Sequence, residues 1–231
     1  MDFNFSTLAE TSFVNNSSNY LKPYDIYLVK LTKIARESIK GSKDPNASYD
    51  VVNLEFTGEN GIFTTNLFVP NRKEDFERGE NPNTHKPSPS AWERFYMTLL
   101  QVMEVLNPKA ANKFKDLAKS GKIKDINVFL EFVTKALSSD NLGEAYLKLV
   151  GRNNNGTIYS TLPGSCYIDQ EGKVKPLNFI HSDKSHLNFS SYENQKADEY
   201  RNAKPTSMDN ESFDVNTSSG DINVDDLIND L

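Results

Sequence analysis

One segment alternates apolar residues on one side with other residues on the opposite side, and only a short turn separates it from a second segment that is expected to form a strand. In YDVVNLEFT, Val52, Leu54 and Phe56 fall on one side, and the turn from Gly58 to Gly61 then leads into IFTTNLFVP. A two-residue period is typical of a β-strand with one buried face, and a tight Gly-containing turn between two such strands predicts an antiparallel hairpin. An antiparallel sheet is therefore the framework that the rest of the chain has to extend or cover.

Further strands are expected on both sides of this hairpin. Before it, YDIYLVKLTKIAR predicts one long strand, whose apolar pattern shifts near Val29 and so indicates a β-bulge and a bend. After it, EAYLKLVGR and TIYSTLP flank the turn from Asn153 to Gly156 and predict a second hairpin. A further short hairpin is expected around Glu171.

Residues 90–138 follow a helical period instead. Ser90-Ala91-Trp92-Glu93 matches a capping box, and apolar residues follow it at helical spacing as far as Met103. A second helix is expected to begin at Pro108, and a third to run from Asp125, its N-cap, to about Leu137. The aromatic residues of this region lie on apolar stripes and are expected in the core: Trp92, Phe95, Tyr96, Phe114, Phe129 and Phe132.

The order of these elements predicts the fold class. Three strands, a helical segment and two strands, all antiparallel, follow the order of an OB-fold. The expected fold is mainly β with inserted helices (α+β): an OB-fold-like five-stranded antiparallel barrel with a helical insert between strands 3 and 4. The expected organisation is an N-terminal arm (1–21), an OB-like domain that binds single-stranded nucleic acid (22–180) and a disordered acidic tail (181–231). Residues 71–89 are polar, contain Gly and Pro and are too long for an ordinary connection, so they are expected to form a mobile loop. Their charges nearly cancel, which favours a solvated loop over a phosphate clamp.

The net charge of −6 is unevenly distributed along the chain. From Thr206 onward there are seven acidic residues and no lysine or arginine, whereas residues 1–205 carry 26 basic and 25 acidic residues. The body is therefore close to neutral, and the acidity belongs to the tail. Such an asymmetry is typical of a tail that interacts with a partner or with the body itself.

Motifs for catalysis are missing from the sequence, and the protein is therefore predicted to be non-enzymatic. It has no Walker A loop, no G-x-G-x-x-G, no H-E-x-x-H and no G-x-S-x-G. Cys166 is the only cysteine, and His181 and His186 lie in a polar stretch without a rigid scaffold, so neither a cofactor nor a metal site is expected. No signal peptide and no apolar run of about 20 residues is visible, which predicts a cytoplasmic protein without membrane association.

The strand order, the stretch LKLVGRNNNGTIYSTLP and the acidic tail with apolar residues at its end together resemble the single-stranded DNA-binding proteins of phage replication systems. The resemblance covers Lys22 to Leu162 as architecture and Asp209 to Leu231 as composition. Two departures are a helical insert of three helices and a final Leu231, where many tails of this kind end in phenylalanine. The resemblance implies a protein of phage DNA replication, recombination and repair that works in the host cytoplasm.

Single strands are held by basic side chains that contact phosphates and by aromatic rings on which bases stack. Side chains of both kinds are expected on the outward face of the strands, around one groove. The alternative is that tyrosines and lysines simply occupy an exposed sheet face, so the interpretation depends on the set as a whole. The predicted single-stranded DNA-binding residues are Lys30, Lys33, Arg36, Tyr49, Tyr146, Lys148, Arg152 and Tyr159.

The last twelve residues, GDINVDDLINDL, combine a helical apolar stripe with aspartates. Asp and Asn are poor helix formers, so this peptide is expected to be disordered when free and to fold on a partner. It is therefore predicted to recruit replication and recombination proteins, or to occupy the body's own basic groove; a purely solubilising tail is the alternative. The predicted docking residues are Asp221, Val224, Asp225, Asp226, Leu227, Ile228, Asp230 and Leu231.

The function predicted from the sequence is therefore that of a non-enzymatic single-stranded DNA-binding protein without strong sequence preference, and a homo-oligomer is left open. The alternative from another class is a viral structural or assembly protein, or a host-directed interaction module, without nucleic-acid binding. Binding to oligo(dT) that weakens steeply with salt separates the two.

Overall fold

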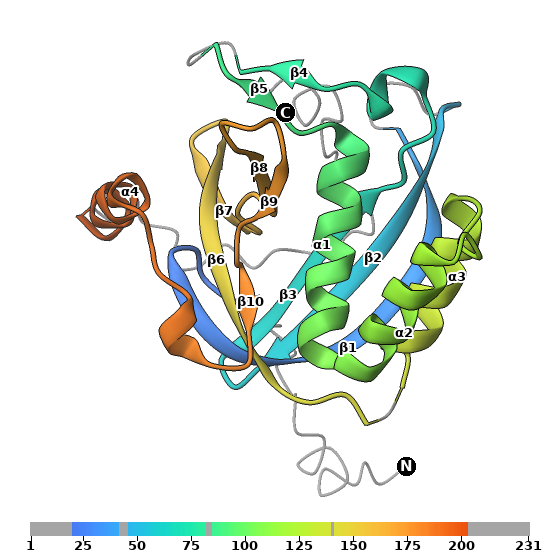
Figure 1. Cartoon of the computed structure of the whole chain (residues 1–231). Coiled ribbons are helices and arrows are strands. Elements are labelled where there is room, and N and C mark those ends of the chain that lie inside the picture. The colour runs from blue at the N-terminus through green and yellow to red at the C-terminus, as the bar shows by residue number, and fades with distance from the viewer. Residues whose placement is uncertain (1–19, 42–45, 82–84, 140, 203–231) are drawn as a thin grey trace, which may run out of the picture.

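A computed structural model of the chain describes residues 20–41, 46–81, 85–139 and 141–202 and shows a mixed α+β protein with a mainly antiparallel sheet (Figure 1). The strands are β1 (Asp25–Lys40), β2 (Ser48–Gly58), β3 (Gly61–Phe68), β4 (Gly79–Glu80), β5 (Pro87–Ser88), β6 (Ala145–Asn154), β7 (Thr157–Thr161), β8 (Cys166–Ile168), β9 (Val174–Pro176) and β10 (Ile180–His181). The helices are α1 (Ala91–Leu106), α2 (Pro108–Lys119), α3 (Ile126–Leu137) and α4 (Ser191–Asn202), with short 3-10 turns η1 (Lys73–Phe76) and η2 (Lys184–His186).

The long strand β1 organises the main sheet. Its first part pairs with β6 and the rest pairs with β2, which in turn pairs with β3, while β7 and β10 both pair with β6. The predicted bulge is present, although it lies between Leu31 and Lys33 instead of near Val29. The two predicted hairpins are confirmed as β2–β3 and β6–β7, and the short one around Glu171 as β8–β9.

The expected closed barrel is not found among the described strands, because β3 and β7 do not pair with each other. The segment Tyr20–Leu21 lies between them instead. The Leu21 amide donates a hydrogen bond to the Ile62 carbonyl of β3 at 3.0 Å, and the Leu21 carbonyl accepts one from the Ser160 hydroxyl of β7 at 2.5 Å. The fold class is therefore confirmed as α+β, while the strands alone leave an opening that this segment bridges.

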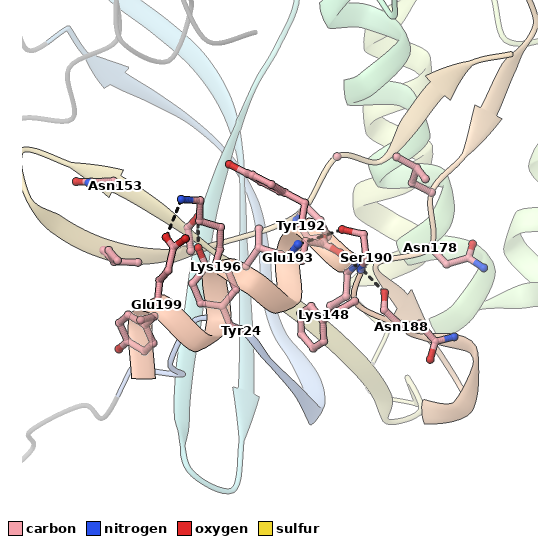
Figure 2. A pocket seen from close by; sticks show the side chains of 18 of the residues that line it. Tyr24, Lys148, Asn153, Asn178, Asn188, Ser190, Tyr192, Glu193, Lys196 and Glu199 are labelled. Atoms are coloured by element: carbon pink, nitrogen blue, oxygen red, sulfur yellow. Dashed lines mark hydrogen bonds and ion pairs between the residues drawn. The ribbon is translucent and has the colours of Figure 1, made fainter. Parts of the chain in front are cut away.

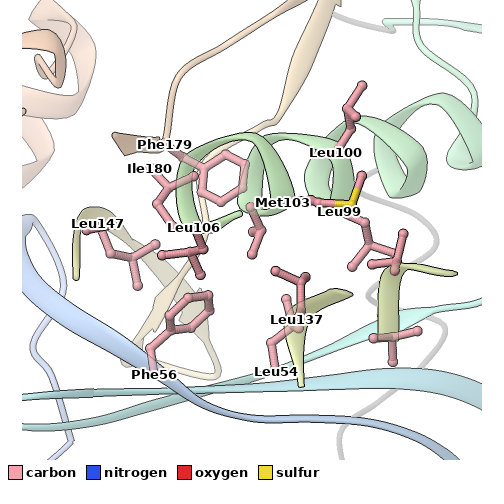
Figure 3. Packing of buried hydrophobic residues seen from close by; sticks show 14 of the residues in the cluster. Leu54, Phe56, Leu99, Leu100, Met103, Leu106, Leu137, Leu147, Phe179 and Ile180 are labelled. Carbon is pink, nitrogen blue, oxygen red and sulfur yellow. The ribbon is translucent and has the colours of Figure 1, made fainter. Parts of the chain in front are cut away.

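The core lies between α1 and the inner face of the sheet (Figure 3). From the sheet, Leu54 and Phe56 of β2 and Leu147 of β6 point toward α1, as the alternation of both strands predicts. The helix contributes the stripe that follows the capping box, including Leu99 and Met103, both with no exposed surface. Burying this stripe against the sheet is what fixes α1 across it, since apolar burial is the main favourable term in folding.

All three predicted helices are confirmed, and α1 and α3 have the N-terminal caps that were predicted for them. Ser90 and Glu93 form the reciprocal capping box of α1, and Asp125 caps α3. Asn107 connects all three helices: it ends α1, its side-chain oxygen caps α2 by accepting from the Ala110 amide at 3.1 Å, and its side-chain nitrogen donates to the Ala136 carbonyl of α3 at 2.9 Å. The predicted core aromatics form one connected cluster, in which Phe114 and Phe129 are almost fully buried.

Two segments that were expected to lack regular structure contain it. Residues 71–89, predicted as a mobile loop, include η1 and the small β4–β5 hairpin, and Arg78 anchors them to α1 through Glu93 at 2.7 Å. The predicted disordered tail was placed from residue 181 onward, which is wrong for residues 181–202, because these include the end of β10, η2 and α4. The predicted docking peptide 220–231 lies outside the described residues, as does most of the predicted arm.

Candidate nucleic-acid interface

The outer face of β2 and β3, opposite the core, carries an aromatic pair. Residues paired across an antiparallel ladder share a face, and the register opposes Val51 to Phe68, so Tyr49 and Phe68 project on the side away from Leu54. Their rings meet edge to face with centroids 6.0 Å apart. Both rings are half-buried, so each keeps part of its surface open to solvent. This is the kind of aromatic surface on which a base can stack.

Polar and basic side chains surround this aromatic pair. The Asn53 side chain donates a hydrogen bond to that of Asn66 at 2.8 Å, one step along the same face. Arg72 follows β3 and binds Asp75 at 3.0 Å. Hydrogen bonding and attraction from Asp75 raise the pKa of Arg72, and a smaller contribution comes from the Tyr49 phenol, so Arg72 is within electrostatic range of Tyr49. Its side chain is 55% exposed, so the guanidinium is accessible to an anion.

The predicted lysines of β1 lie on the same outer side of the sheet. Lys33 opposes Glu55 across the ladder, and its ammonium binds Glu37 at 2.8 Å; this hydrogen bond and the charge attraction raise the pKa of Lys33. Lys30 binds Glu144 at 3.4 Å and lies close to the pair formed by Leu28 and Tyr146, which oppose each other across β1 and β6. Both ion pairs are exposed, so each lysine can exchange its carboxylate for a phosphate at little cost.

Arg36 is placed differently from the prediction. It opposes Val52, whose side chain belongs to the core face, so Arg36 projects on the side opposite to Tyr49. Its guanidinium binds Asp50 at 2.5 Å and the Asn127 side chain of α3 at 3.0 Å. The bulge between Leu31 and Lys33 accounts for the change, because one extra residue moves every later side chain to the other face. Arg36 therefore attaches α3 to the sheet and does not belong to a phosphate-binding groove.

Lys148 is on the outer face of β6, as predicted, but α4 covers it (Figure 2). Only 7% of the residue is exposed. Its ammonium donates to the Glu193 carboxylate at 3.0 Å and to the Asn188 carbonyl at 3.1 Å, and it lies 5.3 Å from the centre of the Phe189 ring. With these partners in place, Lys148 holds α4 on the sheet and is closed to a phosphate.

Arg152 and Tyr159 oppose each other directly across the β6–β7 hairpin. Alternation places both on the same face as Lys148 and Val150, and Tyr159 is 56% exposed. This hairpin is the second place where predicted stacking and basic side chains meet.

The predicted residues therefore do not surround one groove. Tyr146 opposes Leu28 and Tyr49 opposes Ile39, and these positions of β1 are eleven residues apart, which is about 35 Å along the strand. One surface contains Tyr49 and Lys33 on β1–β3, and another contains Arg152 and Tyr159 on the β6–β7 hairpin. Except for Arg36, the sequence predicts the face of these residues, but it does not predict how far the strands are offset.

Two parts of the candidate site were missed. Phe68 could have been found, because the turn from Gly58 to Gly61 fixes the β2–β3 register and so places Phe68 opposite Val51. Helix α4 also has a local signal: Ser190 and Glu193 repeat the S-x-x-E spacing of Ser90 and Glu93, and the Ser190 amide donates to Glu193 at 2.6 Å.

Comparison with known proteins finds no matching family model, no matching curated protein and no matching solved structure. Within the part of the chain that the structure describes, no helix is long and apolar enough to cross a membrane. Across residues 20–41, 46–81, 85–139 and 141–202, no group of three His, Cys, Asp or Glu side chains is arranged to hold a metal ion. The functional assignment therefore depends on the geometry of the outer sheet face.

Proposed function

We propose that this protein is a non-enzymatic single-stranded DNA-binding protein of phage DNA replication, recombination and repair, which binds without strong sequence preference. The observation that carries the proposal is the partly exposed pair of Tyr49 and Phe68 on the outer face of β2 and β3, with the exposed Arg72 in the segment that follows β3. Aromatic faces supply stacking to any base, and basic side chains at their edge meet the phosphates. Lys33, exposed on the same outer side, adds a further cation.

We also propose that the sheet is an OB-type barrel whose opening is bridged by Leu21. The order β3-β2-β1-β6-β7 and the helices between β3 and β6 support this proposal. So do the two hydrogen bonds that link Leu21 to β3 and β7. In OB-folds the outer face of the second and third strands and two adjacent loops bind oligonucleotides. Tyr49 and Phe68 occupy that face, which makes the fold and the site consistent with each other.

The proposed setting is the cytoplasm of the host cell, where a phage replisome works. Recruitment of replication and recombination proteins is assigned to residues 220–231, whose aspartates and apolar stripe suit a groove with a basic rim. Binding to the single strand is assigned to the body alone.

The test is fluorescence anisotropy of labelled oligo(dT) with the full-length protein at about 50 mM and about 200 mM salt, since phosphate contacts make affinity fall steeply with salt. We expect Tyr49→Ala and Phe68→Ala each to weaken binding about 10-fold, because one stacked base contributes about 1 to 3 kcal/mol. Tyr167→Ala is the matched control. Tyr167 is 45% exposed on β8, away from β2 and β3, and its removal should leave the affinity unchanged.

Two results would contradict the proposal. Absence of binding by the folded wild-type protein at the lower salt concentration would favour the interaction module without nucleic-acid binding. Equal losses of oligo(dT) affinity in Tyr49→Ala and Tyr167→Ala would show that the outer face of β2 and β3 is not the binding site. Urea denaturation of each variant separates a loss of binding from a loss of folded protein.

A further inference from the structure

A pocket of about 1060 Å³ lies between the β6–β7 hairpin and α4 (Figure 2). Its volume slightly exceeds the roughly 300 to 1000 Å³ of typical small-ligand sites, and such sites combine apolar walls with a few polar groups. Figure 2 shows the lining side chains arriving from Tyr24 before β1, from the hairpin, from the segment before α4 and from α4 itself. Distant parts of the chain therefore combine to form it.

Aromatic rings form much of the pocket wall. Tyr24 is fixed by its amide, which donates to the Leu149 carbonyl at 3.0 Å, and by its hydroxyl, which donates to the Gly151 carbonyl at 3.3 Å. The Tyr200 ring of α4 lies 5.9 Å from the Tyr24 ring. Tyr192, at the start of α4, also lines the pocket and is 68% exposed. The pocket thus has a fixed aromatic floor and an accessible aromatic rim.

The charged groups that line the pocket are already paired. Lys148 binds Glu193 at 3.0 Å, and Lys196 binds Glu199 at 2.7 Å, so each ammonium is balanced by a carboxylate. A phosphate placed there would meet two carboxylates as well as two cations. An uncharged planar group is therefore a better occupant than an anion.

Polar groups that could form hydrogen bonds with an uncharged planar occupant are also present. Asn178 and Asn188 line the pocket and are exposed, and within the described part of the chain their side-chain amides make no hydrogen bond. An amide offers both a donor and an acceptor, which matches the edge of a nucleobase. Val150 lines the same pocket, and Arg152 follows it on the same face of β6, opposite Tyr159. The pocket is therefore continuous with the hairpin surface.

We propose that this pocket accepts one or more nucleobases of the bound single strand, which enter past Tyr192, while the phosphates remain outside. The proposal rests on the proposed function and extends it, because it assigns α4 to the DNA-binding surface. The chain's own acidic C-terminal peptide is the competing occupant. It fits less well, because neither lysine that lines the pocket is left without a carboxylate to meet its aspartates.

The test combines affinity and cross-linking on the full-length protein. Tyr192→Ala should weaken oligo(dT) binding about 5- to 100-fold, the range for loss of one stacked base. The control Tyr167→Ala should bind as the wild type does. An oligo(dT) that carries single abasic positions should bind the wild type more weakly at one or more positions, and Tyr192→Ala should not discriminate there. An oligonucleotide containing 5-iodouracil should cross-link to Tyr24, Tyr192 or Tyr200, as located by mass spectrometry.

The outcomes separate this inference from the proposed function. If Tyr192→Ala binds with wild-type affinity and cross-links form only at Tyr49 or Phe68, the pocket proposal is wrong while the proposed function stands. If a photoreactive peptide of sequence GDINVDDLINDL cross-links in the pocket and the oligonucleotide does not, the tail is the occupant and the proposal is equally wrong. If the wild-type protein does not bind oligo(dT) at all, the proposed function and the pocket proposal are both wrong.

Discussion

Gly151 shows how one absent side chain determines the packing of the β6–β7 hairpin. A Cβ at this position would lie 2.4 Å from the Tyr24 ring and 2.7 Å from the Ile158 side chain. Tyr24 cannot easily move away, because its backbone and hydroxyl are both hydrogen-bonded to β6. We expect Gly151→Ala to lower the free energy of unfolding by about 1 to 3 kcal/mol, as overpacking of a filled site does, measured by urea denaturation.

The matched control is Gly143→Ala. A Cβ at Gly143 would meet no atom within 4 Å, so its free energy of unfolding should stay the same or rise by a few tenths of a kcal/mol. Equal stabilities of the two variants would contradict the close contact between Tyr24 and β6.

For single residues of the site, the sequence could predict on which face of the sheet the side chain lies, but not which side chains it contacts. Alternation correctly put Lys148 on the outer side of β6, yet the carboxylate that neutralises it belongs to Glu193, 45 residues further along the chain. The prediction for Arg36 was wrong for another reason: the bulge was expected near Val29, before Lys30, whereas it lies after Lys30 and so puts Lys30 and Arg36 on opposite faces. Long-range contacts and exact bulge positions are the information that a local pattern lacks.

Among the elements, the helices of the insert are linked by Asn107, whose side chain contacts both α2 and α3. Replacing it with alanine removes both the cap of α2 and the hydrogen bond to the Ala136 carbonyl. We expect Asn107→Ala to lower the free energy of unfolding by about 1 to 3 kcal/mol, from one lost cap and one unsatisfied carbonyl. Thermal and urea unfolding of the full-length protein measure the change.

Asn107→Asp tests the two contacts separately. Aspartate keeps the oxygen that caps α2 but has no donor for Ala136, so its stability should fall between those of the wild type and Asn107→Ala. If Asn107→Asp is as stable as the wild type, the bond to α3 contributes nothing. If it is as unstable as Asn107→Ala, the cap contributes nothing.

The attachment of α4 is expected to depend on pH. Burial raises the pKa of the Glu193 carboxyl, but hydrogen bonds from the Ser190 amide and Lys148 outweigh it, so the pKa lies below its usual value. A carboxyl whose pKa is lower in the folded state stabilises that state above the unfolded pKa of about 4.3, and loses this contribution as pH falls through the folded pKa. Hydrogen-exchange protection of α4 should therefore be constant from about pH 7 to pH 5 and should decrease below about pH 4.

Glu193→Gln is the control for this titration. Glutamine cannot ionise, so protection of α4 in this variant should be lower at neutral pH, and its further change in acid should be smaller than in the wild type. A wild-type α4 that stays protected in acid while the sheet opens would contradict the role of the Lys148–Glu193 pair.

Elements with both a boundary signal and an apolar pattern were predicted, and elements that lack the apolar pattern or depend on distant contacts were not. A capping box for α1, an N-cap for α3 and the apolar stripe of each helix identified both helices, and a turn of fixed length gave the β2–β3 register. Helix α4 has the same capping spacing, but its polar sequence buries only Ala197, so no apolar stripe marked it. The bridge formed by Leu21 joins residues more than 100 positions apart, which no local pattern can indicate.

For the whole molecule, the distribution of charge matters more than its total. Residues 1–205 carry 26 basic and 25 acidic residues, while the remainder carries seven acids and no base. Exposed pairs such as those of Lys30 and Lys33 can rearrange around a phosphate, so a nearly neutral body is compatible with binding a polyanion. The tail adds a repulsive charge to any strand that approaches, and the effect of this charge is screened by salt.

This charge effect can be separated from docking by two changes in the tail. Replacing Asp221, Asp225, Asp226 and Asp230 with asparagine removes four charges and keeps the apolar stripe, whereas deleting residues 220–231 removes both. If the charge opposes the strand, both variants should bind oligo(dT) about 3 to 10 times more tightly than the wild type at low salt, and the gain should vanish at about 0.5 M salt. Only the deletion should also lose a partner that docks on Val224, Leu227, Ile228 and Leu231. A purely solubilising tail would leave the affinity of both variants unchanged at every salt concentration, because the charge of such a tail does not affect how the body binds the strand.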